Sequence, residues 1–118
     1  MQPNIGATPI FDSSVTGTVE NATTRVTSLY YIHAVNPNTT DVYIQLFNAA
    51  AADVTLGTTA PTQSYLIPGG SGASNRGGFE ETFAWPIRFG TALSYAATTT
   101  ATGNTAPSTA VTLNLAYI

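Results

Sequence analysis

The stretch VTSLYYIHAVNPNTTDVYIQLF, residues 26–47, carries the strongest fold signal in the chain. Its two ends, Val26–Val35 and Val42–Phe47, are rich in β-branched and aromatic residues, which favour strands. The NPNTTD segment between them contains the asparagine, proline and aspartate that are typical of turns. The stretch therefore predicts a β-hairpin. In its second strand, apolar and aromatic side chains occupy both alternating faces, so we expect this strand to be central in its sheet.

Further short strands are expected after this stretch, separated by turn residues. They are SYLIP (64–68), FEETFAWPIRF (79–89), TALSYAATTT (91–100) and VTLNLAYI (111–118). Pro86 restricts its strand to an edge, a strand start or a bulge, because proline cannot donate a ladder hydrogen bond. The glycine-rich GGSGASNRGG (69–78) is expected to be a loop. Six to eight strands without a convincing helix predict an all-β fold, either an antiparallel β-sandwich or jelly roll, or a small barrel.

The first 25 residues, MQPNIGATPIFDSSVTGTVENATTR, differ from the remainder by their prolines, glycines and few apolar side chains. This composition predicts an extended N-terminal arm that contains one short strand at most. We therefore divide the chain into an arm at 1–25 and a β-sandwich domain at 26–118. The arm is expected to become ordered against a partner subunit.

The composition excludes several classes of partner. The chain has 118 residues, of which 43% are hydrophobic and only 8% charged, and its net charge is −3 at pH 7. Lysine is absent and three arginines are scattered, so the basic stripe that nucleic-acid binding requires cannot form. No stretch reaches the roughly 20 apolar residues that span a bilayer. We expect no nucleic-acid and no membrane partner. Because the chain has no cysteine, its stability must come from packing or association.

No group of residues predicts catalysis, a cofactor or a metal ion. His33 is the only histidine and lies in an apolar strand, where we expect it to pack or hydrogen-bond within the sheet. Glu80 and Glu81 are adjacent, so in a strand they point to opposite faces and cannot act as a pair on one substrate. The loop at 69–78 lacks the lysine and the following helix of a phosphate-binding loop. We expect a protein that is not an enzyme and has no small-molecule substrate.

The expected contact residues lie in and just before the strand that contains Pro86. The aromatic residues are expected in the core or at subunit interfaces, although the position of Trp85 beside that proline leaves it able to be exposed. Arg88 is expected to pair with Glu80, with Glu81 or with a neighbouring subunit. The loop that carries Arg76 is expected to touch a neighbour. The interface candidates are Arg76, Phe79, Glu80, Trp85 and Arg88.

Three blocks, LYYIHAVNPNTTDVYIQLFN, VTLGTTAPTQSYLIPGG and WPIRFGTALSYAATTTATGNTAP, resemble the order of blocks in small β-rich virion proteins of tailed bacteriophages and prophages. The resemblance covers residues 26–118. It implies a capsid decoration or cement protein on the outer shell, commonly a trimer, with the major capsid protein as partner and synthesis in the cytoplasm of the bacterial host. The alternative is a tail-associated or carbohydrate-binding β-sandwich module that uses Trp85 to recognise a cell-surface glycan. These families offer no catalytic residues to carry over to this chain.

Overall fold

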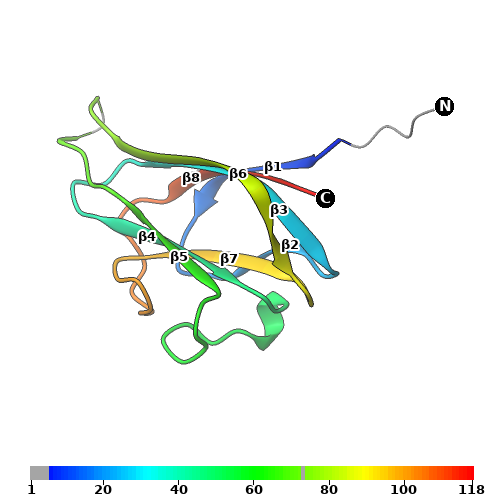
Figure 1. Ribbon diagram of the computed structural model, residues 1–118. Helices are drawn as coiled ribbons and strands as arrows, with labels where there is room; N and C mark the ends of the chain where they lie inside the picture. Colours follow the sequence, from blue (N-terminus) through cyan, green and yellow to red (C-terminus); the bar gives the residue numbers. More distant parts are fainter. Residues whose placement is uncertain (1–5, 73) are drawn as a thin grey trace.

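The computed structural model describes residues 6–72 and 74–118, and these form two four-stranded antiparallel sheets that face each other (Figure 1). A single turn of 3-10 helix, Ala51–Asp53, is the helical element of the described part. The strands are β1 (Thr8–Val15), β2 (Glu20–Thr23), β3 (Thr27–Asn36), β4 (Val42–Phe47), β5 (Gln63–Ile67), β6 (Gly77–Phe89), β7 (Leu93–Thr98) and β8 (Val111–Tyr117). The predicted all-β fold is thus confirmed.

The strand order identifies the sandwich as a jelly roll. The first sheet has the order β1-β8-β3-β6 and the second has the order β2-β7-β4-β5. Four strand pairs are nested along the chain, because β1 pairs with β8, β2 with β7, β3 with β6 and β4 with β5. Rolling this long antiparallel ribbon adds the pairs β3·β8 and β4·β7. Eight strands in two sheets of this kind are the jelly-roll architecture.

The core lies between the sheets and follows the alternation of the strands. In β3 and β8 every core-facing side chain is apolar over the middle of the strand, with Leu29, Ile32 and Leu113 fully buried. In β4 and β7 the opposite sheet contributes Ile44 and Leu93 to the same cluster. As expected from its sequence, β4 is central in its sheet, between β7 and β5. Burying these side chains stabilises the fold by about 1.5–3 kcal/mol each.

The predicted hairpin at residues 26–47 is wrong. β3 belongs to the first sheet and β4 to the second, so the NPNTTD segment crosses from one layer to the other (Figure 1). The physical reason is Asn36, which continues the core-facing positions of β3 and is fully buried. Its side-chain amide donates to the carbonyls of Thr40, at 2.9 Å, and of Ile67, at 3.0 Å. The chain therefore turns inward around this amide and does not fold back beside β3.

A second asparagine extends this buried network to the other end of the ribbon. Asn38 donates to Asn36 Oδ1 through both its backbone N–H and its side-chain amide, each at 2.9 Å. Its side chain also exchanges two hydrogen bonds with the backbone of Thr109, at 2.9 and 2.8 Å. The Asn36 amide also donates to the carbonyl of Pro68 at 3.2 Å, so the two amides join the β3–β4, β5–β6 and β7–β8 connections at one end of the sandwich.

The segment expected to be an extended arm differs from that expectation where it is described. Residues 8–15 and 20–23 form two strands, one at an edge of each sheet, paired with β8 and β7. The backbone carbonyl of Thr16, between them, accepts a hydrogen bond from the Ala97 N–H at 2.9 Å. The sandwich therefore starts at Thr8, well before the expected boundary at residues 25 and 26. The first five residues of the expected arm lie outside the described residues.

A tyrosine and an aspartate join the two sheets near β1. The hydroxyl of Tyr95 in β7 donates to Asp12 Oδ2 in β1 at 2.9 Å. Burial of the Tyr95 ring raises the pKa of its phenol far above 10, and the hydrogen bond and charge of Asp12 act in the same direction. The neutral phenol is thus the form that the folded state favours.

We expect Asn36→Ala to lower the free energy of unfolding by about 2–4 kcal/mol, because it leaves several buried backbone carbonyls without a donor. Urea unfolding measured by circular dichroism tests this. Thr39→Ala is the matched control, since Thr39 lies in the same segment with an exposed side chain and should change stability by less than about 0.5 kcal/mol. Equal stability of the two variants would contradict the role given to Asn36.

The Tyr95 phenol makes stability dependent on alkaline pH. In the unfolded chain tyrosine titrates near 10, and in the folded chain the pKa of Tyr95 is higher. Its stabilising contribution is therefore complete below about pH 10 and is lost as pH rises through the folded pKa. Tyr95→Phe should cost about 1 kcal/mol at pH 8, and this gap should shrink from pH 10 upward in urea titrations. A gap that is constant with pH would refute this assignment.

Candidate functional site

The outer faces of the two sheets differ in how much they are covered. On the second sheet, loop residues cover the outward side chains, so that Gln45, Ser94 and Thr98 are all fully buried. The Ser94 hydroxyl donates to the carbonyl of Ala49, and Gln45 Nε2 donates to that of Gly103. The first sheet has large exposed apolar side chains on β1 and β6. The outer face of the first sheet, with its edge strand β6, is therefore the candidate contact surface.

A row of four side chains crosses this outer face, one from each strand. Phe11 in β1 lies opposite Asn114 in β8, which lies opposite His33 in β3, which lies opposite Glu80 in β6. His33 Nδ1 and Asn114 Nδ2 are 3.4 Å apart. The Tyr31 hydroxyl donates to Glu80 Oε2 at 2.7 Å, and this bond raises the pKa of the tyrosine. The predicted placement of His33 in a hydrogen-bonded sheet environment is thus what the structure has.

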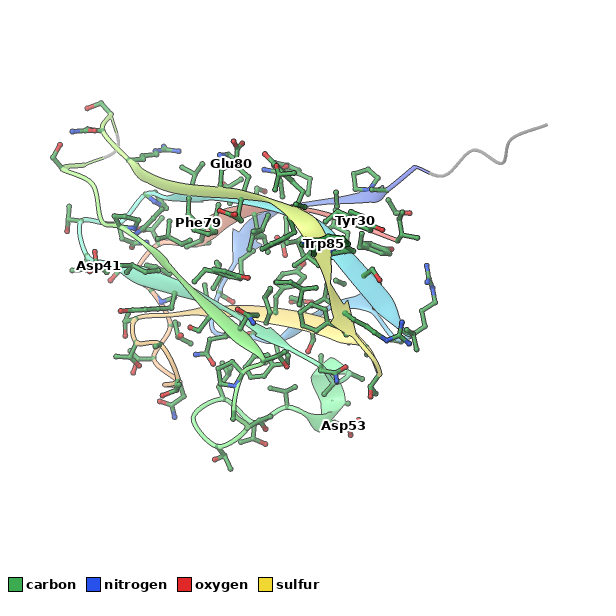
Figure 2. The ribbon with its side chains drawn as sticks, viewed as in Figure 1. Tyr30, Asp41, Asp53, Phe79, Glu80 and Trp85 are labelled. Carbon is green, nitrogen blue, oxygen red and sulfur yellow. The ribbon has the colours of Figure 1, made fainter. Side chains whose placement is uncertain are left out.

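The edge strand β6 contains a large bulge that projects Trp85. Leu29 of β3 lies opposite Ile87 of β6, and Tyr31 lies opposite Thr82. Several β6 residues between Thr82 and Ile87 therefore lie opposite one residue of β3. Figure 2 places Trp85 at the bend of β6, and its side chain is 88% exposed. Bulges of this kind redirect side chains. The edge or bulge position expected for Pro86 is confirmed, and Trp85, whose exposure the sequence left open, is exposed.

The structure separates the five interface candidates into two groups. Arg76, Glu80, Trp85 and Arg88 are exposed. Phe79 is half-buried and stacks on Tyr65 with ring centroids 5.1 Å apart, and Figure 2 shows it on the side of β6 that faces the second sheet. Phe79 therefore belongs to the packing between the sheets.

Within the described residues, Arg88 forms no ion pair with either of the two glutamates expected as its partners. Its register partner on β3 is Ser28. The remaining expectation for Arg88, a partner in a neighbouring subunit, stays a prediction.

The glycine-rich loop has a structural reason for its composition. The backbone of Gly77 lies against the carbonyl oxygen of Pro68, and that of Gly70 lies against the carbonyl oxygen of Asn75, which leaves no room for a side chain at either glycine. The loop expected at 69–78 is present at residues 69–72 and 74–76, residue 73 lies outside the described residues, and Gly77 and Gly78 belong to β6. Close backbone approach therefore explains the glycines here.

Phe11 is the exposed residue that the sequence analysis missed. It is 69% exposed on the outer face of β1, in a segment expected to be an arm outside the sandwich. The available signal was the alternation in TPIFDSSV, where Ile10, Asp12 and Val15 turn inward while Phe11 turns outward. Pro9 and the two serines of this segment obscured the alternation.

The described residues contain no detected pocket and no cluster of three or more potential metal-ligating side chains. No helix in the described part is long and apolar enough to cross a membrane. Comparison with models of protein families and with curated protein sequences gave no match. The resemblance to phage virion proteins therefore rests on the sequence blocks and stays a prediction.

Two aromatic residues of β6, Phe79 and Trp85, should differ sharply in their effect on stability. Phe79→Ala removes a ring that packs on Tyr65 and should lower the free energy of unfolding by about 1–3 kcal/mol. Trp85→Ala removes an exposed ring and should change the stability of the monomer by less than about 0.5 kcal/mol. Thermal unfolding at low protein concentration compares them. A larger loss for Trp85 than for Phe79 would contradict these assignments.

Proposed function

We propose that this protein is a capsid decoration or cement protein of a tailed bacteriophage, which binds the major capsid protein on the outside of the shell and stabilises it. The observation that carries the proposal is the open outer face of the first sheet, with Trp85 and Phe11 exposed at its two edge strands. Aromatic residues are enriched at protein–protein interfaces relative to the rest of the protein surface. Tryptophan is also a residue that commonly dominates the free energy of association.

The chemistry of the surface supports the same proposal. The charged fraction is 8% and the net charge is −3, which suits the exterior of a particle that holds nucleic acid inside. Short threonine, serine and alanine side chains lose little rotamer entropy when they are buried between subunits. Many copies bound to one shell would together give strong overall binding, although each contact is modest. The jelly roll occurs in viral capsid and lectin domains, which is support by analogy of fold.

Binding to capsid shells tests this proposal. Capsid shells are prepared from the phage whose genome encodes this chain, but without the chain itself. These shells should co-sediment with the purified protein. The double variant Trp85→Ala, Phe11→Ala should bind at least about 30-fold more weakly, the size expected for the loss of a dominant contact. Leu66→Ala is the matched control, because Leu66 is a moderately exposed apolar residue on the second sheet and should bind like the parent protein. Failure of the parent protein to bind such shells would refute the proposal.

Glycan binding is the second candidate function, and the exposed Trp85 ring favours it specifically. Sugars stack on exposed aromatic rings, and the row that contains His33, Asn114 and Glu80 offers polar groups on the outer face of the same sheet. In this case a glycan array should give signals that Trp85→Ala abolishes and Leu66→Ala keeps. Glycan binding without binding to shells would replace the first proposal by the second.

A further inference from the structure

The sequence of β6 has a partial chemical symmetry about Ala84, one residue beyond the middle of the strand. Counting outward from Ala84 in GGFEETFAWPIRF, Phe83 corresponds to Trp85, Glu80 to Arg88 and Phe79 to Phe89. Three of the five pairs thus match or complement each other, while Glu81 with Ile87 and Thr82 with Pro86 do not. Two copies of such a strand, placed antiparallel, would bring each residue opposite its counterpart.

The faces of the strand agree with this correspondence. Residues opposite each other in an antiparallel pair point to the same face. Glu80 lies on the outer face of the sheet beside His33, and Arg88 lies on the same face beside Ser28. Phe79 and Phe89 both point toward the core, where Phe89 is fully buried. Glu80 and Arg88 are therefore oriented to meet across a pair of β6 strands.

β6 is also free to pair. It is the last strand of the first sheet, with β3 as its one strand neighbour in the described structure. Glu80, Glu81, Thr82, Ala84 and Arg88 are all exposed along it. Figure 1 shows β6 as a long ribbon at the margin of the sandwich that bends near its middle, where the symmetry of the sequence is centred.

We propose that β6 pairs with the β6 of a second copy of this chain, antiparallel and about a two-fold axis at Ala84, to give one continuous eight-stranded sheet. The two-fold axis makes each contact occur twice, so Glu80 of each copy would pair with Arg88 of the other. Phe83 of one copy, which packs against its own core, would lie opposite Trp85 of the other. The occupant of this edge is thus another copy of the same chain.

Charge complementarity selects this register over its neighbours. A shift of two residues in one direction places Glu80 opposite Pro86, and the same shift in the other direction places it opposite Gly90. Pairing Arg88 with Glu81 instead is excluded by geometry, because Glu81 lies opposite the core-facing Ile32 and so points to the other face. Of these registers, the proposed one alone pairs Glu80 with Arg88. Charges on an edge strand can provide specificity for one register in this way.

The same features rule out a contact within one chain. Because of the bulge, Glu80 and Arg88 lie opposite His33 and Ser28 of β3, positions that are separated by roughly 17 Å at about 3.3 Å per residue. A charge-swap experiment therefore reports on contacts between chains. The inference does not rest on the proposed capsid function, and a two-fold contact can coexist with a three-fold one in a larger symmetric assembly.

Sedimentation velocity over a range of protein concentrations provides the first test. The parent protein should form dimers or other even-numbered assemblies. Glu80→Arg and Arg88→Glu, each alone, should raise the dissociation constant at least about 10-fold, because each places like charges opposite one another. The double variant Glu80→Arg, Arg88→Glu should return it to within about 3-fold of the parent value. Tyr31→Phe measures separately the loss of the Tyr31–Glu80 hydrogen bond, and circular dichroism checks that every variant is folded.

A disulfide provides the second test, in a chain that has no native cysteine. Residues directly opposite in an antiparallel pair have Cα atoms about 4.5–5.5 Å apart, which a disulfide can span. Ala84→Cys should therefore form a covalent dimer on mild oxidation. Ser13→Cys, exposed on β1 at the other edge of the sheet, should form far less. A parent protein that stays monomeric, a double variant without recovery, or equal cross-linking of the two cysteine variants would overturn the proposal.

Discussion

The buried amides of Asn36 and Asn38 are the contacts on which the rest of the fold depends. They satisfy backbone groups in three connections at one end of the sandwich, and they hold the chain where it passes from the first sheet to the second. A buried amide that loses its partners is costly, so the corner cannot relax into an ordinary hairpin without leaving polar groups unpaired. The nested pairing of the eight strands follows from this crossing.

Rolling the ribbon in this way makes the two sheets unequal. The long connections cover the outer face of the second sheet and bury its polar side chains, including Gln45 and Thr98. The outer face of the first sheet keeps its exposed residues and its free edge at β6. Trp85 is exposed because a bulge at that edge turns it away from the core. The location of the candidate contact surface is thus a consequence of the topology.

The sequence predicted the strands better than their partners. Apolar and aromatic side chains on both faces of VYIQLF identified a central strand, and Pro86 correctly indicated an edge or a bulge. Both predictions depend on local chemistry. The hairpin prediction failed because NPNTTD suits either a hairpin or a crossing between sheets, and the burial of Asn36 decides between them. Residues 8–23 were assigned to an arm because their strands are short and polar, and pairing with β7 and β8 gives them their structure. Phe11 was missed for the same reason.

The central claim is that this protein acts through contacts with other chains at β6 and the outer face of the first sheet. Hydrogen exchange followed by mass spectrometry at low and high protein concentration tests it most directly. The account predicts that the amides of Gly77–Phe89 exchange markedly more slowly at high concentration, while those of the opposite edge strand, Thr8–Val15, change little. Exchange in β6 that does not depend on concentration would contradict it.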